Sequence, residues 1–157
     1  MIFFKYKKKG ETNMKSIYLA SPFFNSEELG VYRTAIQRLR AKGYEVYAPQ
    51  EHEVENGWDM TNSEWANHVF VEDIKAIADC DVVMVLNWGM YSDSGTAWEA
   101  GYAYGMEKDI VHVLCGERNT TYSLMMINGA DKVVGFEDIG EWEEKASRVN
   151  LAKIIQK

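Results

Sequence analysis

Residues 91–103, with the sequence YSDSGTAWEAGYA, contain the side chains of this chain that are best suited to chemistry. Asp93 and the serines beside it favour a helix N-terminus, and Gly95 lets the backbone approach a ligand closely. A polar substrate can rest on the free N–H groups of such a helix end. Glu99 falls in the first turns of the same helix, where the helix dipole favours its ionised form. An ionised glutamate suits a nucleophile better than an acid.

A third carboxylate, Asp73, lies one residue off an apolar stripe made by Phe70, Ile74 and Ile77. That spacing predicts a position at the border between core and solvent, where an aspartate needs a partner or a purpose. Tyr18 lies in an apolar run that is typical of a strand, and its hydroxyl can point toward the same cleft.

Phe23 and Phe24 follow that run and are candidates for an apolar wall of the cleft. Several carboxylates around an aromatic pocket resemble the arrangement that breaks glycosidic bonds, in which a nucleophile and a proton-managing group surround an oxocarbenium-like centre. Simpler interpretations stay open for each residue alone. Asp93 can be only a helix cap, Glu99 an exposed carboxylate, and the aromatic residues core packing.

Other reactive motifs do not occur in the sequence. Gly95 and Gly101 form neither the GxGxxG dinucleotide fingerprint nor the GxxxxGK[ST] phosphate loop. His52, His68 and His112 are isolated from one another, and we find no Ser/His/Asp triad signature. We therefore expect no metal and no cofactor.

Composition bounds the function further. The 157 residues are 46% hydrophobic and 26% charged, the balance of one globular domain, and the formal charge of -7 disfavours nucleic acid and anionic membranes as partners. No apolar run approaches the ~20 residues that cross a bilayer, and the start, MIFFKYKKKGETN, reverses the order of a secretory signal. We expect a cytoplasmic protein in which Cys80 and Cys115 are buried and unpaired.

Segments typical of strands and helices alternate along the chain. Strands are expected over residues 16–20, 44–48, 81–86, 110–114 and 132–135, and helices over residues 27–42, 63–78, 94–106 and 141–155. Such alternation requires right-handed crossovers and hence a parallel sheet that is covered on both faces. We predict an α/β fold: a three-layer sandwich with a five-stranded, mainly parallel sheet of the flavodoxin or Rossmann type. In these sheets ligands bind beyond the carboxyl ends of the strands, where the strand order reverses.

Residues 1–13 lie outside this alternation, and we expect them to be an N-terminal extension with a solvated, lysine-rich run. Residues 14–157 are expected to form a single α/β domain.

The sequence resembles the nucleoside 2-deoxyribosyltransferase family over most of residues 14–134. The resemblance rests on four ordered pieces, which are Ile17–Phe24, Trp65–Asp73 with Asp81 at the start of the next strand, Asp93–Ala103, and Ser123–Met125. The third piece is specific, and the spacing of Asp73, Asp93 and Glu99 is similar to that of the family.

This resemblance implies an enzyme that exchanges the base of 2′-deoxyribonucleosides by double displacement at C1′. It implies that Glu99 is the nucleophile of a covalent deoxyribosyl-enzyme, that Tyr18 orients Glu99, and that Asp73 and Asp93 bind or protonate around the base and the sugar hydroxyls. The implied ligands are purine or pyrimidine bases and their 2′-deoxyribonucleosides. The implied substrate-binding residues are Phe23, Phe24, Glu53, Trp65, Gly95, Ser123 and Met125. The Ser123–Met125 segment reaches a neighbouring subunit's site in this family, which implies a homo-oligomer, a hexamer or smaller, with shared sites.

Two positions bear on the choice between transferase and hydrolase, and they point in opposite directions. Ser123 replaces an asparagine, and related 2′-deoxynucleoside 5′-monophosphate N-glycosidases use a serine there for phosphate. The position of Asp93 is a phosphate-binding serine in those hydrolases, and a carboxylate close to a phosphate costs ~4 kcal/mol at an effective dielectric near 20. The transferase is therefore favoured, with the hydrolase and a non-catalytic nucleotide-sensing domain as alternatives. The loop over residues 49–53 aligns poorly, so the preference between purine and pyrimidine stays open.

Overall fold

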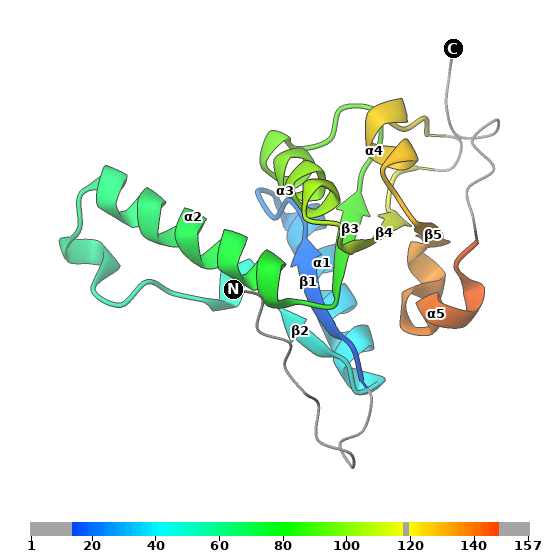
Figure 1. Ribbon diagram of the computed structural model, residues 1–157, viewed down its shortest axis with the longest axis horizontal. Coiled ribbons are helices and arrows are strands. Elements are labelled where there is room, and N and C mark those ends of the chain that lie inside the picture. The colour runs from blue at the N-terminus through cyan, green and yellow to red at the C-terminus, as the bar shows by residue number, and fades with distance from the viewer. Residues whose placement is uncertain (1–13, 118–119, 148–157) are drawn as a thin grey trace.

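Five parallel strands form one sheet in the order β2-β1-β3-β4-β5, as the computed structural model shows for residues 14–117 and 120–147 (Figure 1). The strands are β1 (Ser16–Ala20), β2 (Glu45–Tyr47), β3 (Val82–Asn87), β4 (Asp109–Leu114) and β5 (Lys132–Gly135). This is the flavodoxin-like order, in which the chain reverses its direction of growth between β1 and β3. The predicted fold class and all five predicted strands are confirmed, each within one residue at either end.

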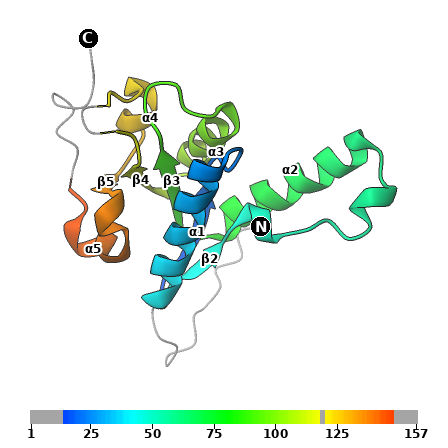
Figure 2. The same cartoon turned by 180° about the vertical axis from the view of Figure 1, so that it is seen from behind.

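Helices cover both faces of the sheet and make three layers. Helix α1 (Ser26–Ala41) packs on one face together with the short α5 (Trp142–Lys145), whereas α3 (Ser94–Gly105) and the end of α2 (Asn62–Asp79) pack on the other (Figures 1 and 2). β3 is the centre of this arrangement because all six of its residues are buried. A strand that is covered on both faces needs a continuous apolar run, which is what this segment has.

Only the C-terminal end of α2 packs against the sheet. Thr61 and Glu64 form a capping box that starts the helix, and Ile77 near its end is fully buried. Phe70, however, is 49% exposed, because α2 and the connection before it project away from the sheet (Figures 1 and 2). The predicted buried stripe of α2 is therefore wrong at Phe70 and correct at Ile77.

The C-terminal segment also differs from the prediction. Instead of one helix over residues 141–155, the chain forms a 3-10 helix (Phe136–Glu141) and the four-residue α5. Ala146 is then extended, and Ser147 pairs with Val133 of β5 through two backbone hydrogen bonds. This pairing ends the helix early. Residues 148–155 of the predicted helix, like the predicted extension over residues 1–13, lie outside the described residues.

A short helix, α4 (Leu124–Asn128), connects β4 to β5. Both cysteines are free, as predicted, with Cys80 buried and Cys115 partly exposed. Within residues 14–117 and 120–147, no helix is long and apolar enough to cross a membrane.

A polar pair in the core holds the loop between β3 and α3. The Asn87 Oδ1 accepts hydrogen bonds from the Gly89 N–H and the Ser92 hydroxyl, both at 3.1 Å. The Asn87 amide nitrogen then faces Nδ1 of His112, 3.0 Å away on β4. Because this amide nitrogen donates, Nδ1 must accept, and the imidazole proton lies on Nε2. Burial lowers the pKa of His112 to about 4, so the ring stays neutral at neutral pH.

We predict that this histidine makes the fold sensitive to mild acid. The unfolded chain binds a proton near the ordinary histidine pKa of about 6.5, whereas the folded chain does so only near 4. Stability is therefore lost as the pH falls from about 6.5 toward 4, by up to about 3 kcal/mol. Urea unfolding between about pH 7 and pH 4.5 measures this loss.

His112→Leu is expected to lower stability at neutral pH, because Asn87 loses its partner, but to flatten the pH dependence. The same substitution at the exposed His68 is the control, and it is expected to leave both quantities unchanged. Equal pH dependence in wild type and His112→Leu contradicts the assignment.

Candidate active site

A cleft of about 820 Å³ lies beyond the carboxyl ends of β1 and β3, where the strand order reverses. Its walls come from the loop after β1, the long connection after β2, one side of α2 and the N-terminal turns of α3. The predicted site residues that line it are Phe23, Phe24, Glu53, Trp65, Asp73, Asp93, Gly95 and Glu99.

A hydrogen bond joins Tyr18 of β1 to Glu99 of α3. Tyr18 is fully buried in β1, and its hydroxyl donates to Oε1 of Glu99 on α3 at 2.7 Å. Burial and the neighbouring carboxylates Glu99 and Asp73 raise the pKa of Tyr18, so the phenol keeps its proton and remains a donor. The bond leaves Oε2 of Glu99 for another partner.

Asp93 is both the N-cap of α3 and a wall of the cleft. Its Oδ2 accepts from the Thr96 N–H at 2.8 Å and from the Thr96 hydroxyl at 3.0 Å. The predicted helix cap is therefore confirmed. Gly95 lies directly against this carboxylate, since a Cβ there would be 3.2 Å from Oδ2 of Asp93. The absence of a side chain keeps that part of the cleft open.

Burial raises the pKa values of two carboxyl groups that line the cleft, those of Glu99 and Asp73. It raises the pKa of Glu99 to about 7, with Asp73 and Asp93 adding to the rise and the Tyr18 hydrogen bond opposing it. Burial likewise raises the pKa of Asp73 to about 6; Glu72 adds to this rise, and His52 opposes it. Near pH 6.5 the pair shares about one proton. One carboxyl can then attack while the other donates a proton, which is the requirement for cleaving a glycosidic bond.

His52 lies in the cleft, although its sequence context gave no sign of a role. Its ring stacks on Tyr47 with centroids 4.0 Å apart, and Tyr47 in turn stacks on Tyr18 at 5.5 Å. The signal that could have found His52 is its place, four residues after the carboxyl end of the expected second strand. Trp58, from the same connection, also lines the cleft and was missed.

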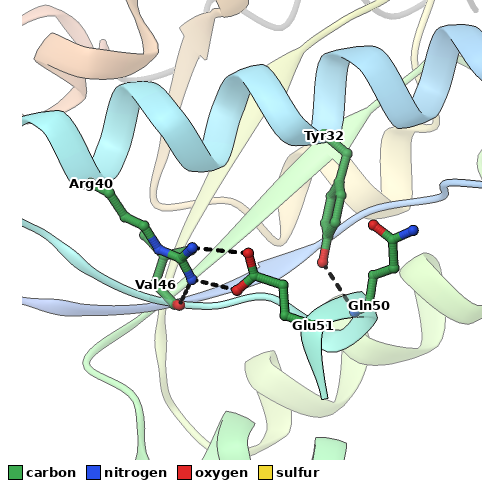
Figure 3. Close-up of polar contacts among 5 residues, drawn as sticks. All are labelled: Tyr32, Arg40, Val46, Gln50 and Glu51. Carbon is green, nitrogen blue, oxygen red and sulfur yellow. Dashed lines mark hydrogen bonds and ion pairs between the residues drawn. The ribbon is translucent and has the colours of Figure 1, made fainter. Parts of the chain in front are cut away.

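The beginning of that connection is tied to α1 (Figure 3). The Arg40 guanidinium donates to both carboxylate oxygens of Glu51, at 2.9 and 2.6 Å, and to the Val46 carbonyl at 2.9 Å. The Gln50 N–H donates to the Tyr32 hydroxyl at 3.3 Å. These contacts hold the chain beside the residues that line the cleft, directly before His52.

Ser123 and Met125 do not line this cleft. They line a second cavity of about 560 Å³ between α3 and α4, which His112 also reaches. Met125 is 77% exposed, and its neighbour Leu124 is 52% exposed. The chain therefore brings together eight of the predicted substrate-binding and catalytic residues in the cleft, with Tyr18 bonded to one of them. Ser123 and Met125 lie apart from this group.

The strand order and the cleft at its switch point define a doubly wound α/β protein. The model of the nucleoside 2-deoxyribosyltransferase family matches residues 17–152, and the chain belongs to that family. The protein is therefore a nucleoside-modifying enzyme of the kind that acts on N-glycosidic bonds.

Solved structures agree with this assignment. The chain is 32% identical to a 2-deoxyribosyltransferase from the psychrotolerant bacterium Bacillus psychrosaccharolyticus, with a TM-score of 0.69 over 90% of this chain and 97% of that one. Two further structures, each 21% identical, share the fold. They are a conserved protein from Enterococcus faecalis (TM-score 0.67, 82% of this chain and 96% of that one) and a CMP N-glycosidase from Clostridium botulinum (TM-score 0.53, 83% and 98%). A search of curated proteins found no match.

Removal of the Tyr18 hydroxyl is predicted to raise the pKa of Glu99 above its value of about 7. The hydrogen bond stabilises the charged form of Glu99, so its loss favours the protonated form. Carboxyl-carbon NMR titration of Tyr18→Phe measures the shift.

Tyr47→Phe is the matched control, because Tyr47 stacks on Tyr18 but gives Glu99 no hydrogen bond. Glu99 is expected to titrate in this variant as it does in wild type. An unchanged pKa in Tyr18→Phe contradicts the role of the bond.

Proposed function

We propose that this protein is a nucleoside 2-deoxyribosyltransferase that exchanges the base of 2′-deoxyribonucleosides. Glu99 attacks C1′ and forms a glycosyl ester, while the electrons of the C1′–N bond pass to the departing base, which takes a proton from Asp73. A second base then attacks C1′, gives its ring proton to the Asp73 carboxylate, and restores the Glu99 carboxylate. The observation that carries this proposal is the half-buried Glu99, held at 2.7 Å by the buried Tyr18 inside the family's cleft.

The hydrogen bonds within the site suit these roles. The Tyr18 bond stabilises charge on Glu99, although burial keeps the pKa of Glu99, about 7, above that of Asp73, about 6. The reactive form, with charge on Glu99 and a proton on Asp73, is therefore the minor form of the singly protonated pair. Asp93 uses Oδ2 for the helix cap, and we assign its other oxygen to a sugar hydroxyl. The helix end then fixes the sugar relative to the nucleophile, which lowers the entropic cost of the attack.

The charge of the cleft favours an uncharged nucleoside over a 5′-monophosphate. Its described lining includes the carboxylates of Glu53, Asp73, Asp93 and Glu99, and no lysine or arginine. A phosphate dianion in such a partly desolvated site meets repulsion and no compensating cation.

Hydrolysis of a 2′-deoxynucleoside 5′-monophosphate is the second candidate, because Ser123 is the residue type that those hydrolases use for phosphate. The fold likeness to a CMP N-glycosidase is compatible with it. A third candidate, a nucleotide sensor, would bind nucleosides without turnover.

We also propose a homo-oligomer, a hexamer or smaller, in which Ser123 and Met125 complete the cleft of a neighbouring subunit. Two observations support it. These residues lie outside their own cleft, and Leu124 and Met125 present apolar side chains to the surface. Exposed apolar side chains grouped in this way are typical of protein interfaces.

The first test is chromatography of 2′-deoxyinosine with adenine. Wild type is expected to form 2′-deoxyadenosine, and Glu99→Ala to lose at least about a thousandfold in rate, because no covalent ester can form. Mass spectrometry of wild type with donor alone is expected to find one added deoxyribosyl group, absent from Glu99→Ala.

The parallel incubation contains 2′-deoxyguanosine 5′-monophosphate in water. Its cleavage to guanine and deoxyribose phosphate, in preference to base exchange, favours the hydrolase. Binding without either product favours the sensor. Base exchange that survives in Glu99→Ala refutes the assigned nucleophile.

Shared sites predict complementation between inactive variants. Glu99→Ala and Met125→Asp, mixed and reassembled, are expected to recover up to about a quarter of wild-type exchange, because a site with intact Glu99 then meets an intact Met125 from its neighbour. A mixture of Glu99→Ala and Asp73→Asn is the control. Both of those residues line one subunit's cleft, so no recovery is expected. Recovery in neither mixture, or full activity of Met125→Asp alone, argues against shared sites.

A further inference from the structure

The lining of the cleft is acidic. Four carboxylates line it: Glu53 from the connection after β2, Asp73 from α2, Asp93 from the N-cap of α3 and Glu99 from α3 itself. Among the described residues of its lining, His52 is the only side chain able to carry positive charge. The field inside the cleft is therefore negative, and the low-dielectric walls strengthen it.

Aromatic faces form much of the remaining wall. Phe23 and Phe24 stack on each other with centroids 5.9 Å apart on one side, and Trp58 and Trp65 line the cleft from the connection and from α2. Phe24 and Trp65 are 77% and 49% exposed, so their rings are available to a ligand. Aromatic faces carry negative charge density and attract cations, most strongly when the cation is planar and weakly hydrated.

We propose that the cleft also accepts 2′-deoxyribonucleosides whose base is a permanent cation, such as an N-deoxyribosyl pyridinium, and cleaves their C1′–N bond. This inference rests on the proposed function and extends its substrate class. A flat cationic ring fits both features of the cleft, because it gains from the carboxylates and from the aromatic walls. A neutral base gains only from the second.

The base of such a substrate can leave without receiving a proton. Glu99 attacks C1′ and forms the same ester, and both electrons of the C1′–N bond pass to the ring nitrogen. This neutralises the positive charge of the ring, and the pyridine departs as a neutral molecule. Water or an acceptor base then attacks C1′, gives its proton to the Asp73 carboxylate, and regenerates the Glu99 carboxylate. In the first step Asp73 has no proton to deliver, so it contributes only its charge there.

The pH dependence therefore separates the two substrate types. A neutral base needs a charged Glu99 and a protonated Asp73, so its rate falls on both sides of about pH 6.5. A pyridinium needs only a charged Glu99, so its rate rises through about pH 7 and then stays level. The other titratable groups around this pair are Tyr18, Tyr32, Tyr47, His52, Glu72 and Asp93. The three tyrosines keep their protons throughout this range, because burial raises their pKa values.

The test uses two ligands that differ in one ring atom. The first is the 2′-deoxyriboside of pyridine-3-carboxamide, which carries the charge. The second is the C-nucleoside in which carbamoylbenzene replaces the pyridinium, which is neutral and cannot be cleaved. We expect the full-length wild-type protein to release pyridine-3-carboxamide faster than the enzyme-free control. We also expect the charged ligand to bind at least tenfold more tightly than the neutral one in competition with 2′-deoxyinosine, and added salt to narrow this ratio.

Three variants complete the test. Asp73→Asn is expected to lower the rate of base exchange with 2′-deoxyinosine more than a hundredfold. It is expected to lower the rate of pyridinium cleavage less than tenfold. Trp65→Leu is expected to reduce the preference for the charged ligand at least threefold. Phe70→Leu, on the same helix, equally exposed and outside the cleft lining, is expected to leave that preference unchanged.

Equal affinity for the two ligands, or no cleavage of the pyridinium by a protein that exchanges 2′-deoxyinosine, overturns this inference and leaves the proposed function standing. Failure of both reactions overturns the two together. Cleavage of the pyridinium that is lost in Glu99→Ala supports both.

Discussion

The site depends on a carboxylate that must stay charged while most of its surroundings are removed from water. Burial and two neighbouring carboxylates disfavour the charge on Glu99, and the hydroxyl of Tyr18 is the one hydrogen-bond donor that opposes them. That donor is rigid, because Tyr18 is fully buried in β1 and stacks on Tyr47. The bond also connects the first strand to the helix after the third, so the sheet must be assembled before Glu99, the proposed nucleophile, is in place.

The remaining structure supplies what this bond requires. β3 is buried along its whole length, and the chain leaves its carboxyl end, next to that of β1, to begin α3. The loop between β3 and α3 is held by the Asn87–His112 pair, and the start of α3 by the Asp93 cap. On the opposite side, Arg40 and Tyr32 of α1 hold the connection that supplies His52 and Glu53 (Figure 3). The acidic groups thus lie on rigid elements, which is how a site can keep like charges close together.

That concentration of acid has a functional meaning. Burial and neighbouring carboxylates raise the pKa values of Glu99 and Asp73, and in the proposed mechanism this lets one carboxyl act as the nucleophile and the other as the acid near neutral pH. The same field disfavours phosphate and favours cationic ligands. One electrostatic feature therefore bears on the chemistry, on the choice between nucleoside and nucleotide, and on the wider substrate class that we propose.

Local patterns in the sequence determined the elements and the acidic part of the site. The apolar run of β3 needs no distant information to be recognised as a buried strand, and Asp93 followed by Gly95 marks a helix start, because strand burial and helix capping are decided by near neighbours. Distant contacts decided the rest. Phe70 is exposed because α2 projects beyond the sheet, the C-terminal helix stops where Ser147 pairs with β5, and His52 enters the cleft because Tyr47 and α1 direct its loop there. Ser123 and Met125 lie apart from Glu99 for the same kind of reason. Their place is set by how α4 packs against α3, and no spacing along the chain encodes that distance.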